Sequence, residues 1–579
     1  MAVSRRCLQR PFNTICLALV LVAALQVYLD IRRTELLMTQ YRRDVDDDDR
    51  RQLDDATPPA ATGGGDLSNN DAATGVGGGG GGSRAIDDVT PNRRRLSMAD
   101  YLRSYTLPAR GGHRACSNVT RPDVKSLYKY KDVYQHFRLT PRGYNVTDAY
   151  FLAFYYDDRF VYTGAKYIRT FVTIKGIGPE RQAAKELIQK TAKWSWSVNA
   201  TPTSVLLWYD GFQHPVSATC STAPAFGITR NVSGQFYYEY IITCALPEID
   251  LLPAHVSLAQ HACAAPVRNY VALTYPRPPA ASGGVAHRDI GVCVASLYGS
   301  MNATDVPYLV SWMEALSVYG VIEVNLNNAL MKLDASVQRV LDYYVTRGRL
   351  LLTHYPVIHA TWTASEQDQA TESTNRMHVG DCFFRNIKRY WHTLVIDLDE
   401  LPVPMRVRSY ADALDAASAR NASLADAHCH TMRSAFFYFD FAPGNPEYPR
   451  HLPLHRYTRR FKTEPVVFGH NDGLGLGKSF HNSRRVVAMG HHLCRSSHRE
   501  LGVHLLKQSF IDETHLLIHH YRRSCKYTVD CQSDDDDGGA GGGNRTVVDS
   551  HIPHSIGAEL RRRVEQVLQQ LNYPTTMTS

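Results

Sequence analysis

The sequence lacks three signatures that would assign it to common functional classes. It has no paired C-x-x-C motifs, which excludes the usual zinc-ribbon and zinc-finger sites. Its formal charge of +8 comes from basic residues interleaved with acids, and without a long basic stripe it does not suggest a nucleic-acid-binding protein. Residues 289–404 contain no G-x-G-x-x-G, so phosphates bound there are not held by a dinucleotide-type glycine loop.

The N-terminus combines a basic start with an apolar run. Residues 1–11 carry three arginines, and residues 12–29 read FNTICLALVLVAALQVYL. This length suffices for a membrane span, and the arginines predict a cytoplasmic tail with the rest of the chain on the luminal side. A cleaved signal peptide ending near Val22–Ala24 is the alternative. We favour the uncleaved anchor, because the apolar stretch continues to Leu29.

Cysteines and glycosylation sequons are consistent with the lumen of the secretory pathway. Ten of the 12 cysteines follow the apolar run and can form disulfides in an oxidising compartment. Cys220 with Cys244, and Cys525 with Cys531, are plausible local pairs. N-x-S/T sequons occur at Asn118, Asn145, Asn199, Asn231, Asn302, Asn421 and Asn544.

Composition divides the luminal part into segments. Residues 30–115 are polar and glycine-rich and predict a disordered stem. Residues 116–285 predict a β-rich, sandwich-like module. A catalytic domain at 286–530, a disordered Asp/Gly-rich insert at 531–549 and a C-terminal helix and tail at 550–579 follow. The expected strands of the module are Ala149–Tyr156, Tyr167–Ile174, Ser204–Tyr209, Gln235–Cys244 and Tyr270–Tyr275.

From residue 289 the pattern changes to alternating strands and helices, which predicts an α/β fold with a parallel sheet. The predicted strands are Ile290–Ser296, Val321–Leu326, Arg349–Tyr355 and a run ending at Asp397, and the predicted helices are Asp305–Tyr319, Asp334–Arg347 and His378–Tyr390. Later strands are expected at Ser434–Phe441, Pro465–Gly469, Ser483–Met489 and Thr514–His520. The tail helix, Ile556–Leu571, is expected to dock on the surface.

The stretch HTLVIDLDELPVP, residues 392–404, is the main functional candidate. A short apolar strand ends in two carboxylates, Asp397 and Asp399, which share a face because side chains alternate along extended chain. Ligands of α/β sheets bind at the carboxyl ends of the strands. Carboxylates placed there are costly to bury unpaired. A divalent cation would neutralise them, and pairing with Arg or Lys is the structural alternative.

Six motifs, in order, resemble glycosyltransferase family 92. They are Cys293–Gly299 (CVASLYG), Trp312–Glu314 with Tyr319–Val321, Val340–Tyr344 (VLDYY), Gly380–Asn386 (GDCFFRN), Ile396–Glu400 (IDLDE) and His519–Arg522 (HHYR). Tyr155–Arg159 (YYDDR) in the β-rich module resembles the upstream region of that family.

The resemblance implies a GT-A-like, Rossmann-type domain in a Golgi type II membrane enzyme. Such an enzyme would transfer galactose from UDP-galactose, with inversion and in β-1,4 linkage, to a glycan on a glycoprotein or glycolipid. A hard divalent ion would stabilise the departing diphosphate, and the family and the oxygen-rich ligands favour Mn²⁺.

Site residues follow from the matching positions. Asp399 is expected to bind the metal directly, Asp397 to contact it through water or to contact the ribose, and His520 to be the third ligand, although a plain strand-end histidine is an equal alternative. Asp381 resembles the position that touches the nucleotide, with a helix N-terminal acid as its structural alternative. Ser296, Leu297 and Tyr298 are expected to line the uridine pocket. The acids considered for the general base are Asp440, Glu464, Asp472, Asp512 and Glu513, of which we single out Asp512 and Glu513 because they precede the His519–His520 strand.

Other functions remain open from the sequence. The same chemistry with another UDP-sugar, such as UDP-N-acetylhexosamine or UDP-glucose, is the main rival, because a few pocket residues set sugar selectivity. A catalytically silent, lectin-like membrane protein would bind glycans and would not need the D-L-D-E cluster. A membrane-tethered structural glycoprotein would need neither aspartate and would leave the α/β half unexplained.

Overall fold

A computed structural model provides the fold, and its described residues all belong to one compact unit within residues 92–579. The described ranges are 113–122, 135–139, 147–159, 165–175, 204–224, 231–232, 235–264, 269–279, 288–294, 300–328, 332–355, 377–420, 427–461, 477–490, 494–495, 508–524 and 546–574. The expected anchor at 12–29 and nearly all of the expected stem lie outside these ranges. Within them, no helix is long and apolar enough to cross a membrane.

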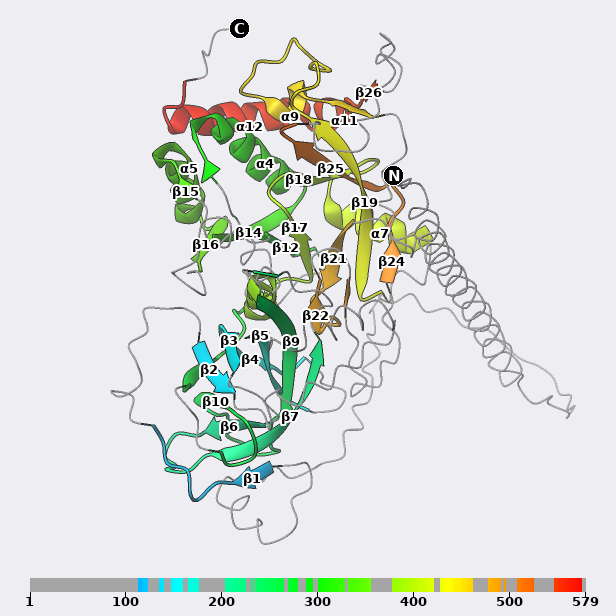
Figure 1. Ribbon diagram of the computed structural model, residues 1–579. Coiled ribbons are helices and arrows are strands. Elements are labelled where there is room, and N and C mark those ends of the chain that lie inside the picture. Colours follow the sequence, from blue (N-terminus) through cyan, green and yellow to red (C-terminus); the bar gives the residue numbers. More distant parts are fainter. Residues whose placement is uncertain are drawn as a thin grey trace, which may run out of the picture. The chain divides into compact units, whose positions relative to one another are not determined.

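The β-rich module is a closed ring of strands, and the expected sandwich is therefore corrected to a barrel (Figure 1). Hydrogen-bonded neighbours run β5–β4–β11–β10–β6–β7–β9, and β9 pairs with β5 to close the ring. Closure removes exposed sheet edges, which a two-sheet sandwich would keep. The strands are β1 (His113–Ala115), β2 (Gln135–Leu139), β3 (Thr147–Phe151), β4 (Phe154–Asp157), β5 (Tyr167–Lys175), β6 (Ser204–Trp208), β7 (Val216–Pro224), β8 (Asn231–Val232), β9 (Gln235–Ala245), β10 (His255–Ala259) and β11 (Val271–Thr274).

Alternation along the barrel strands separates two apolar faces. On β4, Phe154 and Tyr156 belong to one buried cluster and Tyr155 to another, and on β9 Ile242 and Ile241 divide in the same way.

The expected disulfide Cys220–Cys244 is confirmed between β7 and β9. A second disulfide, Cys116–Cys263, was not predicted. The expected pair Cys525–Cys531 lies outside the described residues.

The second sheet is mixed. Its order is β16-β14-β12-β17-β21-β19-β20-β26, with β18 and β25 joined to one side through β19. The four strands from β16 to β17 are parallel, as predicted, whereas β21 runs antiparallel to β17. The strands are β12 (Ile290–Val294), β14 (Val321–Asn328), β16 (Leu350–His354), β17 (His392–Ile396), β18 (Glu400–Pro404), β19 (Cys429–Tyr438), β20 (Arg459–Phe461), β21 (Lys478–Asn482), β24 (Gln508–Phe510), β25 (Leu516–Arg522) and β26 (Thr546–Val548); four short strands, β13 (Ser300–Met301) with β15 (Lys332–Leu333) and β22 (Ala488–Met489) with β23 (Cys494–Arg495), form two separate pairs.

Helices α4 (Val306–Val318), α5 (Ala335–Thr346) and α12 (Gly557–Gln570) share a core with this sheet. Helix α5 is capped by Asp334, whose side chain accepts from the Ser336 amide. Before α4, a 3-10 turn, Ala303–Asp305, starts at Asn302 with a capping box. The tail helix was predicted correctly, and Figure 1 shows α12 in red along α4. Shorter helices are α7 (Tyr410–Arg420), α9 (Pro453–Arg456) and α11 (His551–Ser555).

Several predicted strands are shifted or interrupted. The run Ala149–Tyr156 forms two strands, β3 and β4, and the predicted strand Ser483–Met489 is mostly a turn between β21 and β22. Residues 546–548 of the expected insert form β26. The predicted strand Pro465–Gly469 lies outside the described residues.

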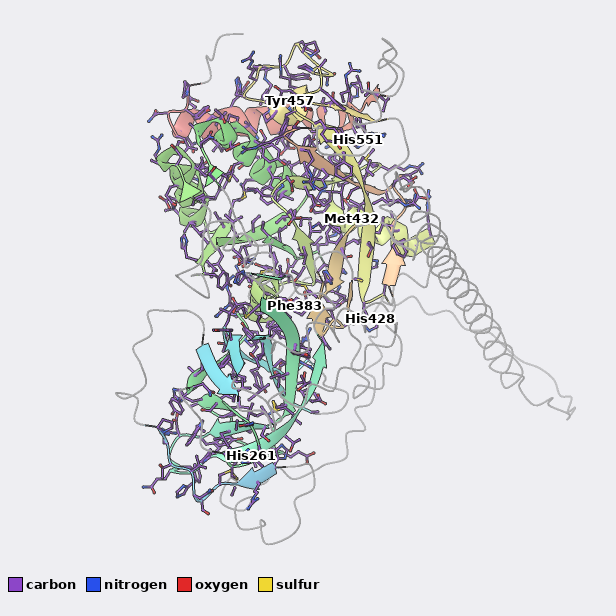
Figure 2. All side chains as sticks on the ribbon, viewed as in Figure 1. His261, Phe383, His428, Met432, Tyr457 and His551 are labelled. Atoms are coloured by element: carbon purple, nitrogen blue, oxygen red, sulfur yellow. A yellow bond between two sulfur atoms is a disulfide. The ribbon has the colours of Figure 1, made fainter. Side chains whose placement is uncertain are left out.

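The barrel packs on the face of β17 that carries Val395. Val395 is buried in one cluster with Tyr155 and Phe171 of the barrel, together with Phe383 and Phe384 of a helix at 377–386. Phe383 is labelled in Figure 2 close to the barrel strand β9. A Cβ at Gly380 would lie 2.3 Å from the Phe171 ring, so only glycine permits this approach. The disulfide Cys293–Cys382 ties the same helix to β12.

Candidate functional site

A tight turn follows β17 and places three carboxylates at the carboxyl end of the parallel strands. The Glu400 amide donates to the Asp397 carbonyl at 3.2 Å, and the Asp397 amide donates to the Glu400 carboxylate at 2.8 Å. The chain then enters β18, although Pro402 and Pro404 argue against a strand in the sequence. Among the described strands, β18 pairs with β25 alone. Its prolines, which lack a backbone N–H, can therefore face the side of β18 on which no strand needs a hydrogen-bond donor.

Two neighbouring elements hold the turn in place through three hydrogen bonds. From α4, the Tyr308 hydroxyl donates to the Leu398 carbonyl at 3.2 Å, and the Trp312 indole donates to the Glu400 carbonyl at 2.7 Å. From β25, the Tyr521 amide donates to the Asp399 carbonyl at 2.7 Å. The turn is therefore a rigid part of the domain, which suits a site that must hold its ligands in fixed positions.

Asp397 is paired with a lysine, the alternative that the sequence left open. Lys478 of β21 is fully buried, and its Nζ lies 2.7 Å from the Asp397 carboxylate and 3.2 Å from the Glu400 carboxylate. Burial lowers the pKa of Lys478, but the two carboxylates outweigh it and raise the pKa overall. Burial also raises the pKa of Glu400. The charge of Lys478 opposes this increase, whereas the negative charges of Asp397 and Asp399 add to it. Sequence analysis missed Lys478.

Asp399 and His520 come together across the β18–β25 pair. His520 is the register partner of Glu400, and its Nε2 lies 3.2 Å from the Asp399 carboxylate, which is 41% exposed. The other ring nitrogen, Nδ1, lies 3.5 Å from the Glu400 carboxylate. A histidine that ligates a metal commonly faces a carboxylate with its second nitrogen, which fixes the ring and its tautomer.

The donors fit a divalent ion only in part. Among the described residues, no set of three or more His, Cys, Asp or Glu side chains is arranged to hold a metal alone. Asp399 and His520 supply two donors, and Asp397 is already engaged by Lys478. Divalent ions in nucleotide sites commonly take one or two protein ligands and complete their shell with phosphates and water. Asp399 and His520 match that requirement.

Exposed polar groups surround this pair at the same end of the strands. The Arg522 Nε lies 3.8 Å from the Asp399 carboxylate. Strands β19 and β25 run in parallel, with Phe436 opposite His520 and Tyr438 opposite Arg522, so the exposed Asp440 follows at this end of the sheet. The Asp440 carboxylate accepts from the Ser524 hydroxyl at 2.9 Å.

The two acids singled out as general bases lie away from the turn. Asp512 and Glu513 precede β25, whereas His520 is near its end. Four residues separate Leu516 from His520, which is about 13 Å along a strand. Asp512 caps the local turn by accepting from the Thr514 amide at 2.7 Å, and Glu513 pairs with Arg433 at 3.2 Å. The structure does not bring them to Asp399.

Asp381 lies inside the contact between the barrel and the sheet. It is buried, and its carboxylate accepts from the hydroxyls of Tyr155 and Tyr355 and from the Arg385 Nε at 2.9 Å. The predicted nucleotide contact is not available to a carboxylate enclosed in this way. Ser296, Leu297 and Tyr298 lie outside the described residues.

Comparisons with known proteins support the family resemblance over the catalytic domain. Residues 288–549 match the model of glycosyltransferase family 92. The match supports a glycosyltransferase domain over these residues. A comparison with curated proteins finds no match.

Solved structures of S. aureus TarS, residues 1–349, show a partial likeness. The structure of TarS alone is 10% identical with a TM-score of 0.21, and the alignment covers 40% of this chain and 60% of that one. The complex with UDP-GlcNAc is 9% identical (TM-score 0.21; 41% and 59% covered), and the complex with UDP is 10% identical (TM-score 0.21; 40% and 60% covered). The chain thus spans about 60% of the length of the solved structures that it matches.

Proposed function

Starting from a glycosyltransferase family 92 match over residues 288–549, we propose that this protein is a metal-dependent galactosyltransferase with a GT-A-like domain. It transfers galactose from UDP-galactose to a glycan hydroxyl with inversion, forming a β-1,4 linkage. One observation carries the proposal: the turn after β17 presents the exposed Asp399 beside His520 at the carboxyl end of a parallel sheet.

Residues of the turn and of β25 have separate roles in donor binding. Asp399 and His520 would hold Mn²⁺, and Glu400 faces the Nδ1 side of the His520 ring and orients it. The bound ion supplies Lewis-acid stabilisation of the charge that builds on the leaving diphosphate. Arg522, half-exposed beside Asp399, would add a second positive charge next to the metal-binding carboxylate.

We choose Asp440 as the general base from its place in the fold. It is exposed and follows β19 at the same end of the sheet as His520 and Asp399. A carboxylate there can accept the proton of the acceptor hydroxyl as the oxygen attacks the sugar. Asp440 thereby replaces Asp512 and Glu513 in the mechanism.

Location and acceptor complete the proposal. We place the protein in the Golgi as a single-pass type II membrane protein, anchored by residues 12–29, with a glycan on a glycoprotein or glycolipid as acceptor. The disulfides Cys116–Cys263 and Cys220–Cys244 of the barrel and Cys293–Cys382 of the catalytic domain support an oxidising compartment for both parts.

A donor panel tests the proposal. The full-length protein is incubated with UDP-galactose, UDP-glucose, UDP-N-acetylglucosamine and UDP-N-acetylgalactosamine in Mn²⁺, with a mixed glycan acceptor, and UDP release is followed with and without a chelator. We expect acceptor-dependent release from UDP-galactose that the chelator abolishes. If UDP is released from another UDP-sugar alone, that sugar replaces galactose as the proposed donor sugar. If the folded protein releases UDP from none of the four donors, the enzyme assignment is contradicted.

A further inference from the structure

We propose that Lys478 is a built-in cation that keeps Asp397 and Glu400 away from the metal, so that Asp399 and His520 remain as the metal-binding pair among the residues that the structure describes. The inference rests on the proposed function for the identity of the ligand but concerns a residue to which neither the family resemblance nor the comparisons assign a role. It follows from the position of one ammonium group among three carboxylates.

The ammonium group is placed where it can satisfy two of the three acids. Lys478 Nζ lies 2.7 Å from Asp397 and 3.2 Å from Glu400. The Asp397 carboxylate is one-third exposed and Glu400 is buried, so both have their charge compensated from the protein side. A lysine is a compact point charge with several donors, and it occupies the position that a bridging cation would take.

Asp399 is the carboxylate that remains available. It points to His520 and to the half-exposed Arg522, and its side chain is the most exposed of the three acids. With Lys478 in place, the protein therefore offers one carboxylate and one imidazole to a divalent ion. Such a pair binds an ion weakly until phosphate oxygens from a nucleotide complete the shell.

The backbone around Lys478 fixes this arrangement. Lys478 begins β21, which lies between β17 and β19, and its register partner is Met432, labelled on β19 in Figure 2. A Cβ at the preceding Gly477 would lie 1.9 Å from the Met432 carbonyl oxygen, so a glycine is needed for β21 to approach so closely. The pairing of β21 with both neighbours therefore fixes the backbone from which the Lys478 side chain extends.

Lys478 acts as a positioning residue. Its side chain is fully buried and so does not touch the donor or the metal itself. Its effect passes through Asp397 and Glu400: it holds one carboxylate beside the turn and the other against the Nδ1 side of His520. Activity alone would not separate this role from a structural one, whereas metal affinity does.

The experiment measures Mn²⁺ binding to the full-length protein by electron paramagnetic resonance, with and without UDP. For the wild type we expect weak binding of Mn²⁺ alone and at least tenfold tighter binding with UDP. Asp399→Asn should weaken binding at least 30-fold. Asp397→Asn, its matched control with the same loss of charge two residues away, should stay within threefold of wild type.

The lysine is tested directly by Lys478→Met, which keeps the length of the side chain and removes its charge. Release of Asp397 and Glu400 should tighten binding of Mn²⁺ alone at least tenfold. The double variant Lys478→Met with Asp397→Asn restores the charge balance and should return to within threefold of wild type. If Lys478→Met does not fold, the comparison of Asp397→Asn with Asp399→Asn still decides the question.

Three results would overturn the inference. They are a loss in Asp397→Asn as large as in Asp399→Asn, wild-type affinity in folded Lys478→Met, and no Mn²⁺ binding by the wild type with or without UDP. A different result would count against the proposed function alone. In that case the variants would show the expected order of Mn²⁺ affinities, but UDP would not tighten Mn²⁺ binding and no UDP-sugar would be turned over. The two claims therefore fail separately.

Discussion

The fold changes the residue that we choose as general base from Asp512 or Glu513 to Asp440. Asp440→Asn keeps the hydrogen bond acceptor for Ser524 but removes the base, so we expect kcat to fall by about 10²–10⁴-fold. Steady-state UDP release from UDP-galactose measures the loss. Mn²⁺ affinity should change little.

The matched controls are the two acids at the other end of β25. Asp512→Asn and Glu513→Gln remove carboxylates of the same kind that cap a turn and pair with Arg433. We expect each to retain activity within about threefold of wild type, because loss of one exposed pair is worth about 1 kcal/mol or less. A larger loss in either control than in Asp440→Asn would return the base to that loop.

The sequence could identify the turn but not its electrostatics. Asp397 and Asp399 were found because an apolar strand precedes them and parallel strands end at ligand sites. Nothing in the sequence predicts that Lys478 is buried. It follows a glycine-rich stretch and precedes a polar one, and a lysine in such a place is normally exposed. Its burial depends on β21 inserting between β17 and β19, a contact between residues distant in the chain.

At the scale of elements, buried histidines make the stability of the domain depend on pH. Burial lowers the pKa of His378 and His481 to about 3 and that of His430 and His519 to about 4. In the unfolded chain these groups titrate near 6.5. Protonation therefore favours unfolding as the pH falls from about 6.5 towards 4, by about 1.4 kcal/mol per pH unit for each histidine.

Chemical denaturation between pH 7.5 and 5 measures this effect. The unfolding free energy of the wild type should be nearly constant above pH 7 as far as these histidines contribute, and should decrease steeply below 6.5. His430→Gln, which can still bond the Ser509 hydroxyl, should flatten the slope by the contribution of one group. An unfolding free energy that rises on acidification through this range would contradict the pKa directions.

Elements defined by local pattern were predicted well, and those defined by distant contacts were not. Strand β17 and helix α12 show clear apolar runs or helical spacing, and both form where expected. Strand β18 contains two prolines and exists only because β25 pairs with it. The barrel was taken for a sandwich because its closing pair, β5 with β9, is set by pairing order, which strand patterns do not record.

At the scale of the whole molecule, the barrel and the part that matches family 92 belong to one compact unit and share a buried cluster. The part that matches family 92 begins at residue 288, yet Phe383, Phe384 and Val395 of that part are buried together with barrel residues. Removing the barrel would also leave the Asp381 carboxylate without its Tyr155 donor. A buried phenylalanine contributes about 1.5–3 kcal/mol, and a domain has only about 5–15 kcal/mol in total.

A truncated chain of residues 288–579 tests this dependence. We expect no cooperative unfolding transition, as followed by circular dichroism in urea. The full-length variant Tyr155→Phe, which keeps the ring and leaves Tyr355 and Arg385 on Asp381, should fold and lose about 1–3 kcal/mol. A truncated chain that unfolds cooperatively at the same urea concentration as the full-length protein would show that the barrel is independent.

The central claim is that the turn after β17 binds the nucleotide sugar through Asp399. The most direct measurement compares UDP release from UDP-galactose by the full-length wild type and Asp399→Asn, in Mn²⁺ and at equal concentrations of folded protein. Loss of several kcal/mol of stabilisation of the leaving group predicts that kcat/KM falls by at least about 100-fold. Equal release by the two proteins would contradict the account and move the donor site away from this turn.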